Sequence, residues 1–140
     1  MNRIPPDHKT GKIGELLVQL KLLVHDIQAA PPIYDSGNDL IAIHNTCFRA
    51  VQVKTSSCSG RGWNIPKKEK KYHVLALVRL AENPNEFDRS NIYLFTKNEV
   101  EEIVGNSNIN HEIPPPRGII ERLDDSHLLE QRLNLFDQQS

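Results

Sequence analysis

The sequence predicts a single α/β domain, a mixed β-sheet flanked by helices. Its 140 residues suit one domain with one hydrophobic core. An apolar share of 38% and a charged share of 25% are typical of a soluble globular chain. The order of predicted elements is a helix and three strands, then two strands and a helix, and this mixture favours a sheet covered by helices.

The first helix is predicted at residues 11–27, after an irregular arm at residues 1–9 where a Pro-Pro pair blocks regular structure. Thr10 is the expected N-cap. Val18 and Leu22 lie off the main apolar stripe, so this helix is expected to be contacted on more than one side. The stripe consists of Ile13, Leu16, Leu17, Leu20 and Val24.

The middle of the chain contains a predicted hairpin and a predicted buried strand. Residues 39–44 and 48–54 are strand-like runs around a turn at residues 45–46. The continuous apolar run at residues 73–80 is typical of a central strand. Short strands are also predicted to start at residues 33–34 and to lie at 63–65, with a further strand at 91–95. Loops are predicted at 55–62 and 83–90, and a helix at 97–104. The C-terminal extension at 105–140 is predicted to be irregular at 105–118 and to form an amphipathic helix at 126–136.

Charge is distributed unevenly along the chain. Residues 1–72 hold 11 Lys and Arg against 6 Asp and Glu, whereas residues 73–140 hold 6 against 12. A basic half is compatible with an anionic partner. The run of lysines at residues 67–71 could contact nucleic-acid phosphates. An equally weighted alternative is that these lysines lie in a solvated turn and aid solubility. The candidate nucleic-acid-binding residues are Arg61, Lys67, Lys68, Lys70 and Lys71.

Several classes of protein are disfavoured by the sequence. No apolar run approaches the roughly 18 residues of a membrane helix, and the N-terminus lacks a signal-peptide pattern, so a cytoplasmic location is expected. Cys47 and Cys58 form no metal-binding motif and are expected to be reduced thiols. The histidines form no HxH or HExxH pattern.

Polar residues at the hairpin form the candidate site. Strand alternation places Val51 and Val53 on one face, with Gln52 and Lys54 on the other. Asp39 stands at the entrance of the preceding strand, after a glycine-containing turn. The hairpin would therefore bring Asp39 towards the end of the strand that carries Gln52 and Lys54.

Glu15 is the fourth candidate, because it is the only carboxylate in the body of the first helix and has apolar neighbours. Carboxylates in such settings are usually paired or bound to metal. Mg²⁺ prefers oxygen ligands, which Asp39, Gln52 and Glu15 could supply, while Lys54 would stabilise developing charge. Taken singly, each has a plain alternative: a solvated glutamate, a turn aspartate, a solvent-facing glutamine and a strand-edge lysine.

These residues resemble the PD-(D/E)XK nuclease superfamily. Glu15 on a first helix, Asp39 after a turn and the phrase Val51-Gln-Val-Lys-Thr-Ser56 are closest to its Holliday-junction-resolvase-like members and its group I intron homing endonucleases, some of which use Gln-x-Lys. Across residues 10–104 the resemblance implies a restriction-endonuclease-like αβββαβ core, Mg²⁺-dependent DNA cleavage (Mn²⁺ being a possible substitute), and a homodimer or higher homo-oligomer.

Two departures from the family pattern matter. Gln52 is neutral, so the site carries one negative charge fewer than the usual form and should bind its metal more weakly. Residues 55–71 do not have a clear helical pattern. Three functions therefore remain open: a DNA endonuclease, a catalytically degenerate nuclease fold that binds nucleic acid, and a protein-interaction module.

Overall fold

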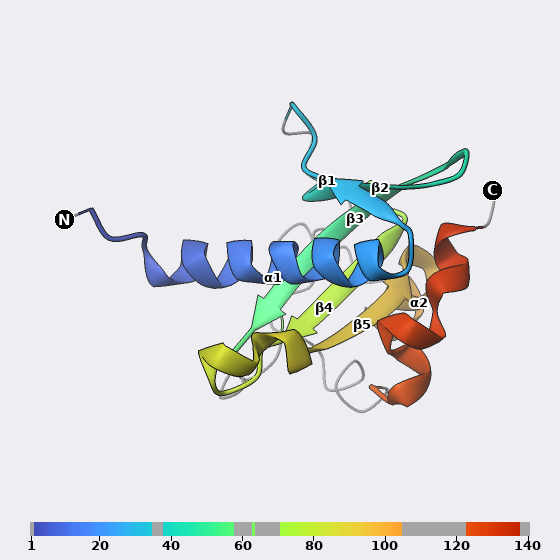
Figure 1. Ribbon diagram of the computed structural model, residues 1–140. Coiled ribbons are helices and arrows are strands. Elements are labelled where there is room, and N and C mark those ends of the chain that lie inside the picture. The colour runs from blue at the N-terminus through green and yellow to red at the C-terminus, as the bar shows by residue number, and fades with distance from the viewer. Residues whose placement is uncertain (1, 35–37, 58–62, 64–70, 105–122, 138–140) are drawn as a thin grey trace.

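A mixed sheet of five strands forms the centre of the molecule (Figure 1). The structure is a computed structural model that describes residues 2–34, 38–57, 63, 71–104 and 123–137. The sheet order is β1-β2-β3-β4-β5; β3 and β4 are parallel and the other neighbours antiparallel, which confirms the predicted mixed α/β class. The strands are β1 (Gln28–Ala30), β2 (Leu40–His44), β3 (Cys47–Ser56), β4 (Val74–Arg79) and β5 (Asn91–Thr96).

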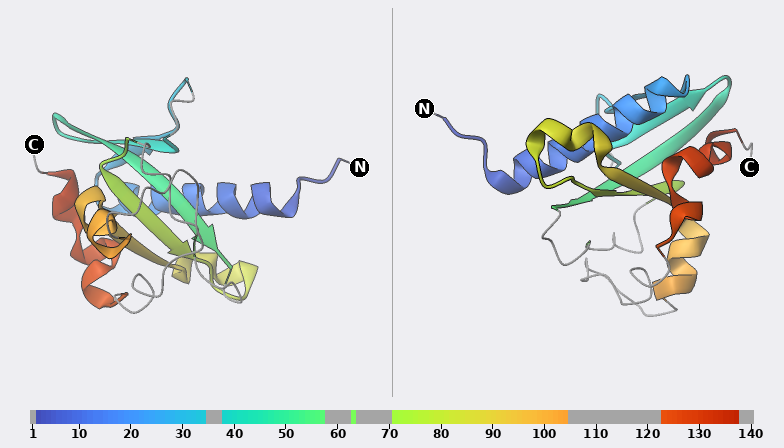
Figure 2. Two further views of the ribbon diagram at one scale, coloured as in Figure 1. Left: turned by 180° about the vertical axis from the view of Figure 1, so that it is seen from behind. Right: turned by 60° about the horizontal axis from the view of Figure 1, so that its bottom comes forward.

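The two faces of the sheet are covered by different elements (Figure 2). Helix α1 (Pro6–Val24) and the C-terminal turns pack on one face, where Leu17 and Phe136 share a core with Val51 and Val53. Helix α2 (Lys97–Val104) lies at the other face and forms a second core. The described members of that second core are Trp63, Tyr72, Leu75, Leu77, Phe95 and Val100.

The predicted hairpin is confirmed, and the strand pairing shows which face of the sheet each side chain of β3 lies on. β2 and β3 pair antiparallel around a turn in which Asn45 has a positive φ of 54°. In the parallel register with β4, Gln52 lies opposite Leu75 and Lys54 opposite Leu77, both members of the second core. Side chains at paired positions lie on one face of a sheet, so Gln52 and Lys54 share the face away from α1, as alternation predicted.

Helix α1 begins earlier and ends earlier than the sequence suggested. Its first residue is Pro6, so residues 6–9 of the predicted arm are helical. Proline is favoured at the first helical position, because its fixed φ suits a helix and its missing N–H has no helical partner there. The helix ends at Val24 because Asp26 adopts a left-handed φ of 65°. The backbone N–H of Ile27 then bonds Leu22 O.

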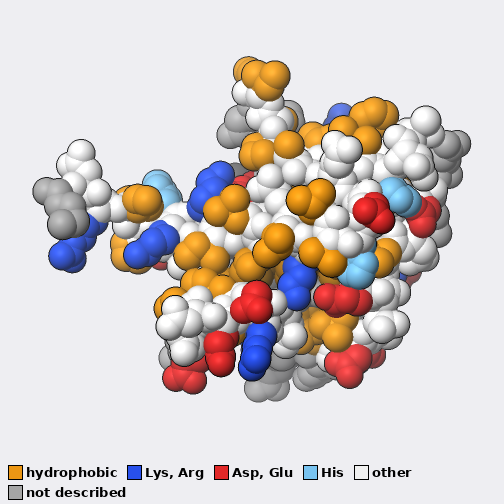
Figure 3. Space-filling view, in the orientation of Figure 1, with side chains coloured by type: hydrophobic (Ala, Val, Ile, Leu, Met, Phe, Trp, Pro, Cys, Tyr) orange, Lys and Arg blue, Asp and Glu red, His pale blue; other side chains and the backbone are white. Residues whose placement is uncertain are grey.

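The predicted stripe of α1 is wrong in orientation. Leu16, Leu20 and Val24 are 55%, 49% and 68% exposed, and hydrophobic side chains are visible along the outer face of α1 in Figure 3. The buried face carries Gly14, Leu17, Val18 and Leu22. Of these, only Leu17 belongs to the predicted stripe, while Val18 and Leu22 were expected off it. The cause is a close approach: a Cβ on Gly14 would stand 2.8 Å from Thr55 Cβ of β3. Only glycine permits an approach this close, so the face of α1 that carries Gly14 packs against the sheet.

Other segments also differ from the predictions. Ile33 and Tyr34 are exposed and lie outside any strand, while a strand forms earlier, at Gln28–Ala30. The predicted loop at 83–90 contains a 3₁₀ helix, η1 (Pro84–Arg89), and β3 extends to Ser56. Predictions for residues 58–62, 64–65 and 105–118 fall outside the described residues. The strands predicted at 73–80 and 91–95, and the helix at 97–104, are confirmed.

The predicted helix at 126–136 is instead three short 3₁₀ turns. Leu128 interrupts it with extended angles (φ −57°, ψ 144°) and forms a bridge with Tyr93 of β5. Arg132 then donates to Leu94 O at 2.9 Å and to Glu99 Oε1 at 2.7 Å. These long-range contacts take the place of the backbone hydrogen bonds that a continuous helix would form. The turns are η2 (Asp125–His127), η3 (Leu129–Gln131) and η4 (Leu133–Phe136).

Candidate active site

Asp39 occupies the point at which β2 separates from β3. β2 pairs with β3 only as far as Val51, and Asp39 N donates to Val51 O at 3.2 Å. Beyond Val51, the strand edge is closed by the aspartate side chain: Asp39 Oδ2 accepts hydrogen bonds of 2.8 Å from Val53 N and of 2.8 Å from Gln52 Nε2. The carboxylate therefore lies at the edge of the sheet, between its two faces.

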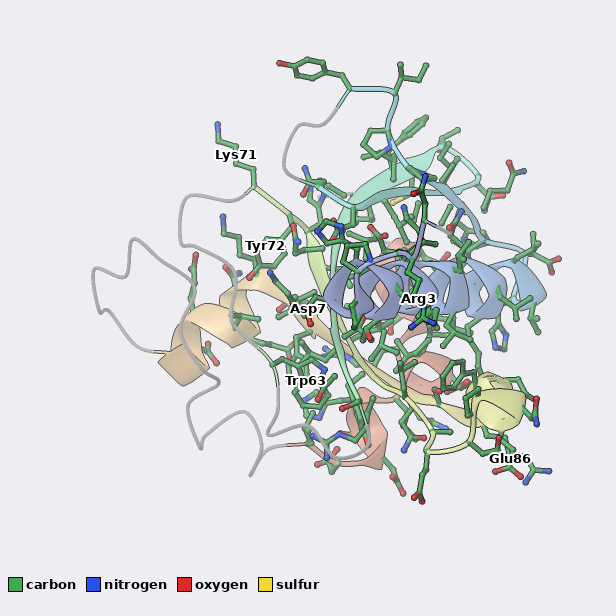
Figure 4. The ribbon with its side chains drawn as sticks, turned by 90° about the vertical axis from the view of Figure 1, so that its left-hand side faces the viewer. Arg3, Asp7, Trp63, Lys71, Tyr72 and Glu86 are labelled. Carbon is green, nitrogen blue, oxygen red and sulfur yellow. The ribbon has the colours of Figure 1, made fainter. Side chains whose placement is uncertain are left out.

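A cavity of about 430 Å³ opens beside this carboxylate on the α1 side. Glu15 of α1 reaches the same cavity as Asp39 and Val53. Lys12 Nζ lies 3.1 Å from Glu15 Oε2; the lysine side chain is 61% exposed and the glutamate side chain 19%. Figure 4 looks at this end of the molecule and labels Asp7 on α1. The described lining residues are Asp7, His8, Gly11, Lys12, Glu15, Asp39 and Val53.

Within the described part of the chain, some buried side-chain oxygens next to Asp39 and along β3 have no hydrogen-bond partner. Gln52 is 3% exposed, and its Oε1 has no hydrogen-bond partner among the described residues, although its Nε2 is bonded to Asp39. Asn38 Oδ1 and Thr55 Oγ1 are in the same state. Buried polar atoms nearly always have a partner, which can be water or an ion. Gln52 Oε1 therefore fits the oxygen chemistry of a hard cation.

The structure brings together three of the four predicted catalytic residues. Glu15 and Asp39 line one cavity, and Gln52 is hydrogen-bonded to Asp39. Lys54 is half-buried and lies on the Gln52 face of β3, across the sheet from α1. Asp39 is thus the link between a glutamate on one face and the Gln-x-Lys residues on the other.

The acidic content of the site is low. Within the described ranges, no group of three or more His, Cys, Asp or Glu residues is arranged to hold a metal. The predicted set contains two carboxylates and one amide oxygen. Mg²⁺ commonly binds proteins through one or two carboxylates and completes its shell with water and substrate phosphate, so this set is compatible with Mg²⁺.

The predicted nucleic-acid-binding residues are mostly outside the described part of the chain. Arg61, Lys67, Lys68 and Lys70 fall there, while Lys71 is exposed just before β4 (Figure 4). No helix in the described ranges has both the length and the apolar character needed to cross a membrane.

Asp7 and His8 line the cavity but were not predicted, because residues 1–9 were expected to be irregular. Lys12 also lines it; this residue lies within the predicted helix, but the face of the helix that meets the cavity was not predicted. A helix start at Pro6 would have been a usable signal, since proline is favoured at the first helical position. Residues 7, 11 and 15 are spaced by four and therefore share one helix face, which points Asp7 towards the same cavity as Glu15.

Comparison with known proteins supports the fold through one solved structure, whereas two comparisons of the sequence found no match. No family model matches the sequence, and no curated protein matches it. Among solved structures, the bacterial homing endonuclease I-Ssp6803I is similar, with a TM-score of 0.59 over 94% of this chain and 93% of its own. The sequence identity is 16%. The chain therefore has an endonuclease-like fold of a mixed sheet flanked by helices.

Proposed function

We propose that this protein is a Mg²⁺-dependent endonuclease that hydrolyses phosphodiester bonds in DNA, a cytoplasmic enzyme of the PD-(D/E)XK type. The observation that carries the proposal is the placement of Asp39, which is hydrogen-bonded to Gln52 and Val53 and shares a cavity with Glu15. The fold similarity to a homing endonuclease supports the same class of reaction.

Asp39 and Glu15 would hold the metal, with Gln52 supplying an amide oxygen. The observation that supports this fit is Gln52 Oε1, a buried oxygen that none of the described residues contacts by a hydrogen bond. When bound, Mg²⁺ would polarise a phosphate oxygen and lower the pKa of a water. Gln52 Nε2 and Val53 N orient the Asp39 carboxylate from two directions. Lys54 would stabilise negative charge that develops on the phosphate.

The test is metal-dependent cleavage by the wild type and Asp39→Asn. Both proteins are titrated with Mg²⁺ and Mn²⁺ on linear, supercoiled, single-stranded and branched DNA. Wild type should cleave at least one substrate, and Asp39→Asn should lose on the order of 10²-fold or more in rate. Arg89→Gln, an exposed change in η1, is the matched control and should retain activity. Equal cleavage by wild type and Asp39→Asn would refute the assignment.

We also propose that the enzyme works as a homodimer or higher homo-oligomer, because cutting both strands of a duplex requires two sites. The outer face of α1 supports this proposal, since Leu16, Leu20 and Leu23 are spaced by four and three residues and follow the half-buried Ile13 at a spacing of three. This is the spacing of a helix-pairing seam, and the three leucines are exposed. Leu20→Glu should shift the sedimentation coefficient to that of a monomer, whereas Arg89→Gln should not.

One observation favours the alternative, a degenerate nuclease fold that binds nucleic acid or a protein without cleavage. The ammonium of Lys12 is paired with Glu15 in the cavity and would compete with a metal for that carboxylate. Under the alternative, DNA binding persists without any metal-dependent cleavage, and Lys12→Met does not create metal binding. Under the primary proposal, Lys12→Met increases the affinity for Mg²⁺.

A further inference from the structure

A second cavity lies at the end of the sheet where β4 begins and β5 ends. Its volume is about 220 Å³, the space of roughly seven waters at about 30 Å³ each. None of the described residues that line it is Asp or Glu. The polar and aromatic lining residues are Arg49, Tyr72, His73, Thr96, Lys97 and Asn98.

Two cationic side chains, those of Arg49 and Lys97, line this cavity. Arg49 Nε donates to Leu135 O at 3.3 Å, and its Nη1 donates to Phe48 O at 3.1 Å. No carboxylate of the described residues forms an ion pair with Arg49. Lys97 Nζ lies 5.5 Å from the ring centre of Tyr72. The cavity is therefore lined by the pre-positioned guanidinium of Arg49 and the ammonium of Lys97, with no carboxylate among its described lining residues.

Further donors border the same space. His73 Nδ1 accepts the Ala50 N–H at 2.9 Å, so the proton of the neutral ring is on Nε2. Burial and then the charge of Arg49 lower the pKa of His73, which keeps the ring neutral. Lys97 and Asn98 are the first two residues of α2 and follow Thr96, the last residue of β5. Anions with several acceptor oxygens suit such a set of donors.

The cavity is close to the candidate active site along β3. His73 is paired with Ala50, and Ala50 and Gln52 are two residues apart on the same face of the strand, or about 7 Å. Successive phosphates of one DNA strand are about 3.4 Å apart along the helix axis. The exposed Lys71 immediately precedes Tyr72 (Figure 4), so the predicted basic run ends at this cavity.

We propose that the cavity lined by Arg49, His73 and Lys97 binds a phosphate group of the DNA backbone, one to a few nucleotides from the phosphate held at Asp39. This inference rests on the proposed function for its ligand, DNA, but it does not require cleavage. The cavity thereby positions the substrate strand and contributes affinity that is independent of base sequence.

The experiment measures binding of a labelled DNA duplex by fluorescence anisotropy, in EDTA, over a series of KCl concentrations. Each lost phosphate contact reduces the slope of log K against log salt by about 0.9. Lys97→Gln and Arg49→Gln should each weaken binding and show this reduced slope, while Lys97→Arg should restore it. Arg89→Gln, at the opposite end of β4 and β5, removes a matched charge and should leave the slope unchanged.

Two results would overturn the proposal. The first is an unchanged salt slope for both Lys97→Gln and Arg49→Gln, with thermal unfolding showing that they are folded; if Arg49→Gln does not fold, Lys97→Gln alone decides. The second is that inorganic phosphate shifts the NMR signals of the His73 and Asn98 amides saturably while DNA binding is unchanged in both variants. This result would assign the cavity to a free phosphate. The binding measurement is made in EDTA and involves no cleavage. It can therefore be interpreted even if the protein does not cleave DNA.

Discussion

Gln52 donates a hydrogen bond of 2.8 Å from its Nε2 to Oδ2 of Asp39. The bond joins the start of β2 to the middle of β3 at a position where the two strands no longer pair. In the usual form of the motif that the sequence resembles, an acidic residue takes the place of Gln52. Here the neutral amide supplies a donor to its neighbour, and this relationship decides how both positions respond to substitution.

Asp39→Ala should destabilise the protein more than Asp39→Asn. Alanine leaves Val53 N–H and Gln52 Nε2 without their acceptor, and a buried donor without a partner costs about 1–3 kcal/mol. Asparagine keeps an acceptor oxygen of similar placement and should lose less than half as much. Urea unfolding of both variants in EDTA gives the two free energies of unfolding. Equal losses would mean that the side-chain oxygen is not part of the strand edge.

Gln52→Glu should make the protein depend on divalent metal for stability. The change replaces the donor to Asp39 with a second carboxylate, so two like charges stand in hydrogen-bond contact. Without metal, the melting temperature should fall below that of wild type, because the two carboxylates repel each other. Mg²⁺ should raise the melting temperature of the variant more than that of wild type, since it neutralises the pair. A metal response equal to that of wild type would exclude Gln52 from the metal site.

Gly14→Ala and Gly11→Ala form a matched pair within α1. At Gly14 the new Cβ would stand 2.8 Å from Thr55 Cβ, whereas at Gly11 nothing lies within 4 Å. Overpacking typically costs about 1–3 kcal/mol, while glycine to alanine in an open helical position gains roughly 0.5–1 kcal/mol. Gly14→Ala should therefore lower the free energy of unfolding and Gly11→Ala should raise it. Changes of the same sign would show that α1 can move away from β3.

Local signals were sufficient to predict the hairpin and its polar cluster. The turn at residues 45–46 and the alternation of β3 are short-range patterns, and they predicted both the β2–β3 pairing and the common face of Gln52 and Lys54. The contact of Asp39 with Gln52 follows from the same register. Helix α2 was also predictable, because Thr96 and Glu99 form a reciprocal capping box.

Long-range contacts account for the incorrect predictions. Two stripes of α1 are similarly apolar, and only the contact between Gly14 and Thr55 selects the one that is buried. The bridge between Leu128 and Tyr93 interrupts a segment whose apolar spacing alone resembles a helix. Lys12, which is paired with Glu15, could not be assigned to the cavity until the orientation of α1 was known.

Lowering the pH should destabilise the protein through His73. Burial, followed by the charge of Arg49, places the pKa of His73 below its ordinary value of 6.5. The unfolded chain then binds protons more readily than the folded protein. The stability contributed by neutral His73 is accordingly complete above about pH 6.5 and is lost as the pH falls through the lowered folded value. Protonation of Nδ1 also removes the acceptor for Ala50 N–H.

The measurement is the melting temperature of wild type and His73→Asn from neutral to mildly acidic pH. The variant keeps a side-chain acceptor but does not titrate, so its curve should be flatter than that of wild type. NMR titration of the imidazole in Arg49→Gln provides the second readout, because loss of the neighbouring charge should raise the pKa of His73 towards 6.5. Parallel melting curves for wild type and His73→Asn would show that another group causes the acid sensitivity.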